Sequence, residues 1–311
     1  MSKVALVVGA ASNLGYQVLR KLSDVYKGKI YFTTEDETSG YNILQNLQRE
    51  NLELHHLKID ITYTRSIIKV RHFIQDNDER IDLIINLTDY VMEKNLSHFE
   101  KVRRTLSVNF YGFINFGKLI YPLLNENSRV INVSGPAGLL ATIENEDKRR
   151  RLSDTTLTED ELVAILQEYE DAARRGVEKT EGWGLSVHAV SKVAQNAVTF
   201  LQHREWADKG VVINCVNPGN LSHREGRKTT KVFEEGAKAI LYLALEAPLS
   251  LKGNFVWSNY SVIEWNSDPY NFLMEKPNNT FEIEPRTSRS HGTYLCRETT
   301  RHKFIETLII F

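Results

Sequence analysis

The chain has 311 residues, of which 41% are hydrophobic and 25% are charged, and its formal net charge is -1. This length and composition are typical of a globular protein with one large α/β domain and an appendage. A net charge near zero excludes a global field that would attract nucleic acid or an anionic membrane, so neither is expected as a partner.

Cysteine usage and the N-terminus bear on location. There are only two cysteines, Cys215 and Cys296, which excludes a disulfide scaffold and favours a reducing compartment. The sequence reaches the apolar run Val4–Val8 without a charged leader, so no signal peptide is expected. No apolar run approaches the roughly 20 residues that span a bilayer. These features predict a cytoplasmic protein.

The first half of the chain alternates between short apolar runs and segments with helical spacing. Apolar runs of this length are typical of buried parallel strands. They are Val4–Val8, Ile30–Thr33, Leu54–Ile59, Leu83–Asn86 and Val130–Val133. Strand–helix alternation implies right-handed crossovers and a parallel sheet covered on both faces. The sequence therefore predicts a Rossmann-type doubly wound α/β fold with about seven strands.

Helices are expected between these strands, and both element types recur later. The expected helices and later strands are, in chain order, helices over Leu14–Leu22, Tyr41–Leu47, Ile67–Ile74, Phe99–Leu124 and Ser186–His203, a strand over Val211–Val216, a helix over Lys231–Ala247 and a strand over Asn254–Trp257.

Two stretches depart from the alternation. Residues 139–183 are charged and helical, and Thr158 and Glu161 have capping-box spacing before a helix over Leu162–Ala173. We expect one domain over residues 1–266 with this stretch as an insertion. Residues 267–311 contain three prolines and show no strong period before their apolar end, so we interpret them as an extended or partly disordered tail, or as an arm docked on a surface.

The first strand runs into the loop Gly9-Ala10-Ala11-Ser12-Asn13-Leu14-Gly15, which opens a helix. In this context backbone N–H groups and the positive end of the helix dipole face a dinucleotide pyrophosphate. The loop resembles the Thr-Gly-x-x-x-Gly-x-Gly loop of the short-chain dehydrogenase/reductase family. Gly9 and Gly15 match, Val8 replaces Thr, and Asn13 replaces the middle glycine. Asn tolerates positive φ better than most residues, but its side chain adds bulk where a phosphate approaches.

The rest of the chain resembles the family in the same order. Asp60 resembles the aspartate that contacts the adenine, and Asn217-Pro218-Gly219 resembles the turn beside the nicotinamide. Asn86-Leu87-Thr88-Asp89 stands where the family has Asn-Asn-Ala-Gly, so Asp89 replaces a glycine. The insertion, which ends in Glu181-Gly182-Trp183, and the segment Phe255–Trp265 are similar to the carbonyl reductase branch. The resemblance covers residues 1–265.

The resemblance also implies which residues contact a cofactor. These are Gly9, Asn13, Leu14, Gly15, Glu35, Asp60, Asn86, Lys192, Pro218 and Gly219. Carbonyl reductases of this branch use NADPH, with basic residues at the 2′-phosphate, where this chain has Ser12 and Glu35. A carboxylate repels a phosphate but accepts hydrogen bonds from a free ribose. We expect no cofactor or weakly bound NAD(H), with NADP(H) disfavoured, unless Glu35 is only a solvated turn residue. No metal site is expected.

Carbonyl reduction in this family uses a Tyr-x-x-x-Lys pair, a serine after the fifth strand and an asparagine that holds a relay water. Lys192 and Asn109 match two of these positions. The tyrosine position is His188 and the serine position is Gly135. Ser134 is adjacent, but neighbours in an extended segment point to opposite sides.

Two functions remain open. The departures favour a carbonyl reductase-like protein that has lost catalysis and acts as a binding or structural protein through its surface and residues 267–311, which would bind a protein partner. The alternative is an active NAD(H)-dependent oxidoreductase that reduces small carbonyl compounds with His188 as proton donor. The insertion resembles one that covers the usual dimer face, so the core is expected to be monomeric.

Overall fold

A computed structural model describes residues 3–47, 53–78, 80–90, 92–184, 186–219, 221 and 229–267. The tail expected over residues 267–311 lies outside the described residues, apart from Ser267. Its extended character and its partner therefore stay predictions.

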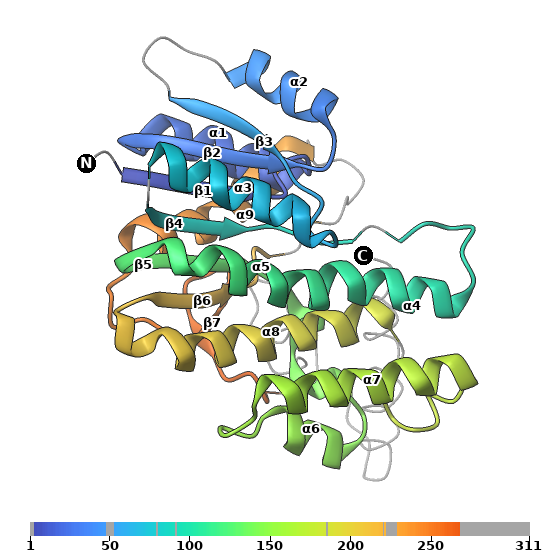
Figure 1. Ribbon diagram of the computed structural model, residues 1–311. Helices are drawn as coiled ribbons and strands as arrows, with labels where there is room; N and C mark the ends of the chain where they lie inside the picture. The colour runs from blue at the N-terminus through green and yellow to red at the C-terminus, as the bar shows by residue number, and fades with distance from the viewer. Residues whose placement is uncertain are drawn as a thin grey trace, which may run out of the picture.

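A single sheet forms the centre of the molecule, with the strand order β3-β2-β1-β4-β5-β6-β7-β8 (Figure 1). The strands are β1 (Lys3–Val8), β2 (Gly28–Thr34), β3 (Leu54–Lys58), β4 (Ile81–Asn86), β5 (Leu124–Val133), β6 (Val212–Val216), β7 (Phe255–Val256) and β8 (Val262–Ile263). All pairings are parallel except that of β7 with β8. The predicted fold class is confirmed, with β1 in the interior of the sheet and a short antiparallel strand added at one edge.

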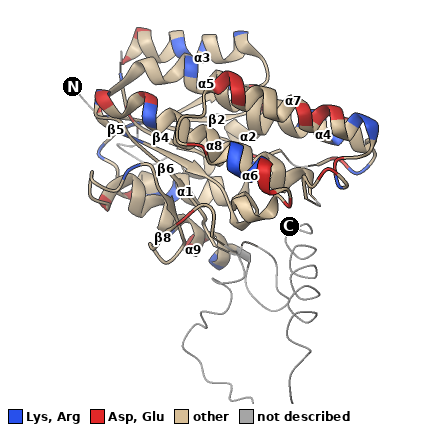
Figure 2. Cartoon of the chain, turned by 90° about the horizontal axis from the view of Figure 1, so that it is seen from below, with Lys and Arg blue, Asp and Glu red and all other residues tan. Residues whose placement is uncertain are grey.

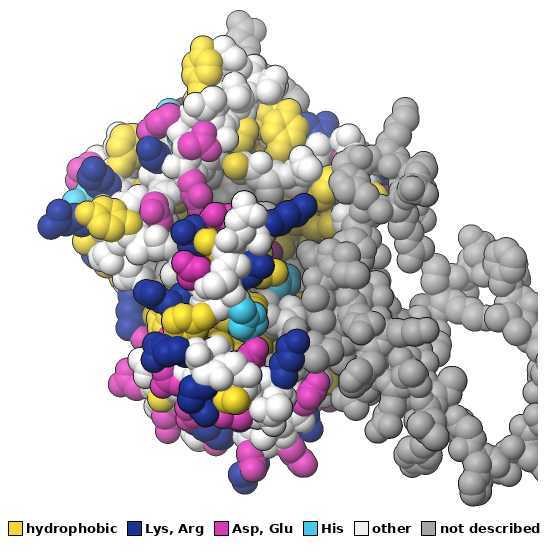
Figure 3. All heavy atoms as spheres, turned by 90° about the vertical axis from the view of Figure 1, so that its right-hand side faces the viewer, with side chains coloured by type: hydrophobic (Ala, Val, Ile, Leu, Met, Phe, Trp, Pro, Cys, Tyr) yellow, Lys and Arg dark blue, Asp and Glu magenta, His cyan; other side chains and the backbone are white. Residues whose placement is uncertain are grey.

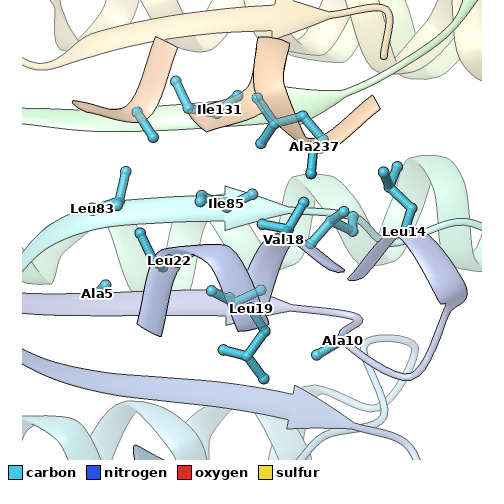
Figure 4. Packing of buried hydrophobic residues seen from close by; sticks show 14 of the residues in the cluster. Ala5, Ala10, Leu14, Val18, Leu19, Leu22, Leu83, Ile85, Ile131 and Ala237 are labelled. Carbon is cyan, nitrogen blue, oxygen red and sulfur yellow. The ribbon is translucent and has the colours of Figure 1, made fainter. Parts of the chain in front are cut away.

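Helices cover both faces of the sheet. One layer contains α1 (Asn13–Val25), α2 (Glu37–Leu47) and α9 (Thr229–Leu241), and the other contains α3 (Thr64–Asn77), α5 (Phe113–Ile120) and α8 (Val187–Trp206). Figure 4 shows how α1 packs: Leu14, Val18, Leu19 and Leu22 lie over the sheet, and Ala237 of α9 lies on the side of Val18 and Leu14. Their spacing of three to four residues puts these side chains on one helix face, which the sheet removes from water.

The predicted helix over Phe99–Leu124 is wrong in detail. It consists of α4 (His98–Leu106), a π-helical segment η1 (Ser107–Gly112), α5 and a 3₁₀ turn over Tyr121–Leu123, after which β5 begins at Leu124. Pro122, in the first turn of the 3₁₀ segment, cannot donate a backbone N–H and so ends the helix. The predicted helix over Lys231–Ala247 also changes, because α9 gives way to a π-helical segment over Tyr242–Glu246.

The insertion forms an outer layer beside α4 and α8 (Figure 1). It contains α6 (Glu146–Leu152) and α7 (Glu159–Arg175), and Thr158 and Glu161 form the predicted capping box at the start of α7. Leu162, Ile165 and Tyr169 of α7 are buried against both helices. This packing fixes the insertion against α4 and α8.

Charged residues of both signs are interspersed along the helices in Figure 2. Within the described ranges, no helix is both long and apolar enough to cross a membrane.

Candidate functional site

A cavity of about 750 Å³ lies at the carboxyl ends of the strands. Its walls come from the segments that follow β1, β2, β3, β4, β5 and β6. The strand order reverses between β1 and β4, and ligands of open α/β sheets bind at such a switch point. Figure 3 views this side of the molecule, where acidic, basic, histidine and hydrophobic side chains are mixed on the visible surface.

The glycine loop after β1 is shaped for close approach of backbone groups. Gly9 has φ +79°, and a Cβ there would lie 3.2 Å from the backbone of Leu87 and Thr88. At Gly15 a Cβ would lie 2.8 Å from the Cα of Ala10. These contacts require glycine at both positions.

The loop also presents the start of α1 to the cavity. Ser12 caps the helix, because its Oγ accepts a hydrogen bond from the Gly15 N–H (3.0 Å). Ser12, Asn13 and Leu14 line the cavity. Asn13 is the first residue of α1 and does not have positive φ, so the positive φ considered for it is wrong. The positive end of the α1 dipole therefore faces the cavity, as anion binding requires.

The end of the cavity formed by the residues that follow β2 is acidic. Glu35 and Asp36 line it, and partial burial together with the charges of Asp60 and Asp36 raises the pKa of Glu35. Asp60 itself is exposed, and its Oδ1 accepts hydrogen bonds from the N–H and hydroxyl of Thr62 (2.9 and 2.6 Å). The buried side chains of Ile59 and Ile61, rather than the Asp60 carboxylate, form the wall there.

At the opposite end of the cavity, Asp89 connects three of the expected catalytic residues. Its Oδ2 lies 3.2 Å from Nε2 of His188, and its Oδ1 lies 3.3 Å from Nζ of Lys192. The Asn109 Nδ2 donates a hydrogen bond to the same Oδ1 (2.9 Å). The structure thus brings Asn109, His188 and Lys192 together around the Asp89 carboxylate. The sequence identified Asp89 only as the replacement of a family glycine and did not predict these contacts.

The backbone explains why these groups meet. His188 and Lys192 are four residues apart on α8, so they share one helix face. Asn109 lies in η1, and π-helical segments often occur at functional sites. Its Oδ1 accepts from the Tyr90 N–H (2.9 Å) and its Nδ2 also donates to Ser191 Oγ (3.0 Å). These hydrogen bonds fix Asn109 between the segment after β4 and α8.

The electrostatics favour an ionised Asp89. Burial of its carboxyl opposes ionisation, but the Lys192 charge and the hydrogen bonds from His188 and Asn109 outweigh it and hold the pKa of Asp89 well below its usual range. Lys192 is almost fully buried, with 5% of its side chain exposed, so Asp89 supplies its counter-charge.

No hydroxyl stands at the expected serine position. Gly135 is extended, with φ −173°, and a Cβ placed there would meet nothing within 4 Å. Ser134 contributes to the cavity wall, but its Oγ is buried without a partner in the described part of the chain. That oxygen lies 2.7 Å from where a Cβ on Gly138 would be, so it faces Gly138.

The remaining expected cofactor residues shape the backbone. The Asn86 Oδ1 accepts from the Thr88 N–H (3.0 Å), which turns the chain toward Asp89. Gly219 has φ +93°, and its N–H donates to Asn217 Oδ1 (2.9 Å), while Pro218 lines the cavity. Across the described residues, no group of three or more His, Cys, Asp or Glu side chains is placed to hold a metal ion.

We predict that Asp89→Asn lowers the free energy of unfolding by about 1–2 kcal/mol at pH 7, a range kept small because 41% of the Asp89 side chain is exposed. A carboxyl whose pKa is lowered by folding stabilises the protein above its unfolded-state pKa of about 3.9, and this contribution is lost as pH falls through the folded-state pKa. Urea denaturation from pH 7 to pH 2 should therefore show the two proteins converging below about pH 4. Asp76→Asn, at an exposed position of α3, is the control. A difference that does not change with pH would contradict the assignment.

Comparison with known proteins is consistent with this geometry. The family model described as short chain dehydrogenase matches residues 3–146. Rat carbonyl reductase (NADPH) 3 is 30% identical over 259 residues, which are 79% of this chain and 92% of the relative. Rabbit carbonyl reductase (NADPH) 1 is 29% identical over 254 residues, which are 79% of this chain and 92% of the relative. The names of these relatives include NADPH, which does not support the expectation that NADP(H) is disfavoured.

Solved structures agree on the fold. Salutaridine reductase from Papaver somniferum superposes with a TM-score of 0.71 at 21% identity, covering 81% of this chain and 99% of that one. Menthone neomenthol reductase from Mentha piperita gives a TM-score of 0.70 at 21% identity, covering 83% and 99%. The sheet order, the glycine loop and the relatives lead to one conclusion: the chain belongs to the short-chain dehydrogenase/reductase family and is carbonyl reductase-like.

Proposed function

We propose that this protein keeps the carbonyl reductase fold and cavity, has lost carbonyl reduction, and acts as a binding protein. One observation carries the proposal: Asp89 binds both Nε2 of His188 and Nζ of Lys192. In the family, the residues at these two positions supply the proton and lower the pKa of its donor. Here both groups are directed to a carboxylate of the protein itself.

The geometry of His188 adds to this argument. Nε2 is the ring nitrogen farthest from the backbone, and it is the one that faces Asp89. The remaining Nδ1 lies closer to the helix, and imidazole is already shorter than the phenol of a tyrosine. Gly135 also removes the hydroxyl that would polarise a carbonyl oxygen. Loss of one such donor typically costs about 10²–10³ in rate, so two changes together predict activity near background.

A second candidate is an active NAD(H)-dependent oxidoreductase with His188 as the proton donor. The same Asp89 contact favours it in one respect, because Nε2 of His188 lies 3.2 Å from the carboxylate, which fixes the ring in place as a proton donor requires. The two candidates therefore differ in whether wild-type protein turns over carbonyl compounds.

We predict background rates for wild-type protein with NADH or NADPH and a panel of aldehydes and ketones. The variant Asp89→Gly/Gly135→Ser/His188→Tyr should gain at least about 100-fold, because it frees Lys192 and restores both hydroxyls. The open space at Gly135 makes the serine sterically acceptable. The matched control is His72→Tyr, at an exposed position of α3, in wild-type background. Absorbance at the nicotinamide band measures the rate. Wild-type turnover at about 1–1000 per second would refute the loss of catalysis and support the His188 donor.

We also propose that the cavity disfavours NADP(H), although the relatives carry NADPH in their names. Glu35 and Asp36 line its acidic end, and Asp60 adds to the local negative charge that raises the pKa of Glu35. A 2′-phosphate there would be repelled.

Calorimetry should accordingly find NADP(H) bound no more tightly than NAD(H). Glu35→Ala should tighten NADP(H) at least about threefold more than NAD(H), because it removes one unit of like charge. Glu37→Ala is the control, since the neighbouring Glu37 is exposed and does not line the cavity. Submicromolar NADPH affinity of the wild type would sink the proposal.

The partner remains a proposal from sequence, carried by residues 267–311. These follow β8, the last strand among the described residues. The prolines and interspersed aromatic residues of the tail suit binding across another protein. We expect a protein truncated after Asn266 to melt within a few degrees of the full chain and to lose partners in pull-downs. A large drop in melting temperature would show instead that the tail belongs to the core.

A further inference from the structure

The two ends of the cavity differ in their fitness for a dinucleotide. The end formed mainly by the segments after β1, β2 and β3, with Leu87 and Val108, has groups suited to an adenosine phosphate. Ile59, Ile61, Leu87 and Val108 are buried residues that line the cavity and form apolar walls for a base. The carboxylate of Glu35 can accept hydrogen bonds from ribose hydroxyls.

The phosphate loop keeps Gly9 and Gly15, while Asn13 adds a side chain to the cavity wall beside it. Gly9 lets the loop pack against the backbone of Leu87 and Thr88, because a Cβ there would lie 3.2 Å from both. The start of α1, with Ser12 as its cap, lines the cavity and favours a negative charge. A phosphate can therefore sit at the loop without any other part of a dinucleotide being bound.

The other end does not fit. Asp89 lies in the cavity wall at a position where the family pattern has glycine, and its carboxylate forms an ion pair with the Lys192 ammonium group. A nicotinamide nucleoside entering there would have to displace this ion pair and the Asn109 and His188 contacts. It would leave Lys192 buried without its counter-charge, which is costly.

We propose that the cavity holds the adenosine 5′-phosphate part of a ligand, as in ADP, and not the nicotinamide half of a dinucleotide, and that Asp89 sets this difference between the two halves. The inference rests on the proposed function and names the ligand class of the same cavity. It makes Asp89 a specificity-determining residue, because its carboxylate holds Lys192 and His188 at one end of the cavity.

The test is calorimetric titration of the full chain with ADP, NAD⁺ and NADH. For wild-type protein we expect the three dissociation constants to agree within about threefold, because the nicotinamide half adds no net contact. Asp89→Gly should tighten NADH at least about tenfold and leave ADP unchanged within about twofold. Asp89→Asn keeps the side-chain volume and removes the charge, so it should give part of that gain if the glycine variant is poorly folded.

The control acts at the opposite end of the cavity. Glu35→Gln should weaken ADP and NADH by the same factor, because both carry the adenosine ribose that we place there. Thermal melts establish that each variant is folded. Wild-type protein that binds NADH at least tenfold more tightly than ADP would overturn the inference, as would a failure to bind ADP. Tight NADH binding without carbonyl reduction would leave the proposed loss of catalysis standing, whereas turnover would contradict that loss directly.

Discussion

The ion pair between Asp89 and the almost fully buried Lys192 is the contact around which the site is organised. Lys192 projects from α8 beneath the cavity, where an unpaired ammonium group would be expensive. Asp89 neutralises it, and the same carboxylate receives His188 and the Asn109 amide. The polar groups of Lys192, His188 and Asn109 are therefore paired with Asp89 within the protein and are not left for a ligand.

The fold makes this contact possible through the ends of its strands. β4 ends in Asn86, whose side chain turns the chain through Thr88 toward Asp89. On α8, His188 and Lys192 are four residues apart and so lie on one helix face. Asn109 of η1 lies between α8 and the segment after β4. The glycine loop after β1 lines a different part of the cavity wall, although Gly9 packs against the backbone of Leu87 and Thr88, just before Asp89. The side chain of Asp89 therefore changes the charges at one end of the cavity, while the glycines of the loop are kept at the other.

Sequence patterns predicted seven of the eight strands in the described residues, because buried parallel strands are nearly continuous apolar runs. The capping box of α7 was equally local, since Thr158 and Glu161 are three residues apart. Prediction failed where the chain departs from regular spacing. The π-helical segments leave no period of their own, β8 is only two residues long, and the strand β5 starts in polar sequence.

The sequence was enough to identify the site residues one by one, but not to predict the contacts among them. Comparison with the family pattern identified Asn109, His188 and Lys192, and it marked Asp89 as a substitution. Nothing in the local sequence gives the distance between the end of β4 and α8, which are about a hundred residues apart. The available signal was that a carboxylate replaced glycine beside two positions bearing a lysine and a histidine. These two changes, Asp89 for glycine and His188 for tyrosine, together with the retained Lys192, are consistent with mutual charge pairing.

The ionisation of Asp89 is the most direct test of this account, because the proposed loss of catalysis and the ligand preference both depend on the carboxylate being held by His188 and Lys192. Carbon-13 NMR of the labelled Asp89 carboxyl, followed against pH, measures it in the intact chain. The account predicts a titration midpoint well below the ordinary value for Asp of about 3.9, moving back toward that value in Lys192→Met. A midpoint at or above the ordinary value in wild-type protein would contradict it.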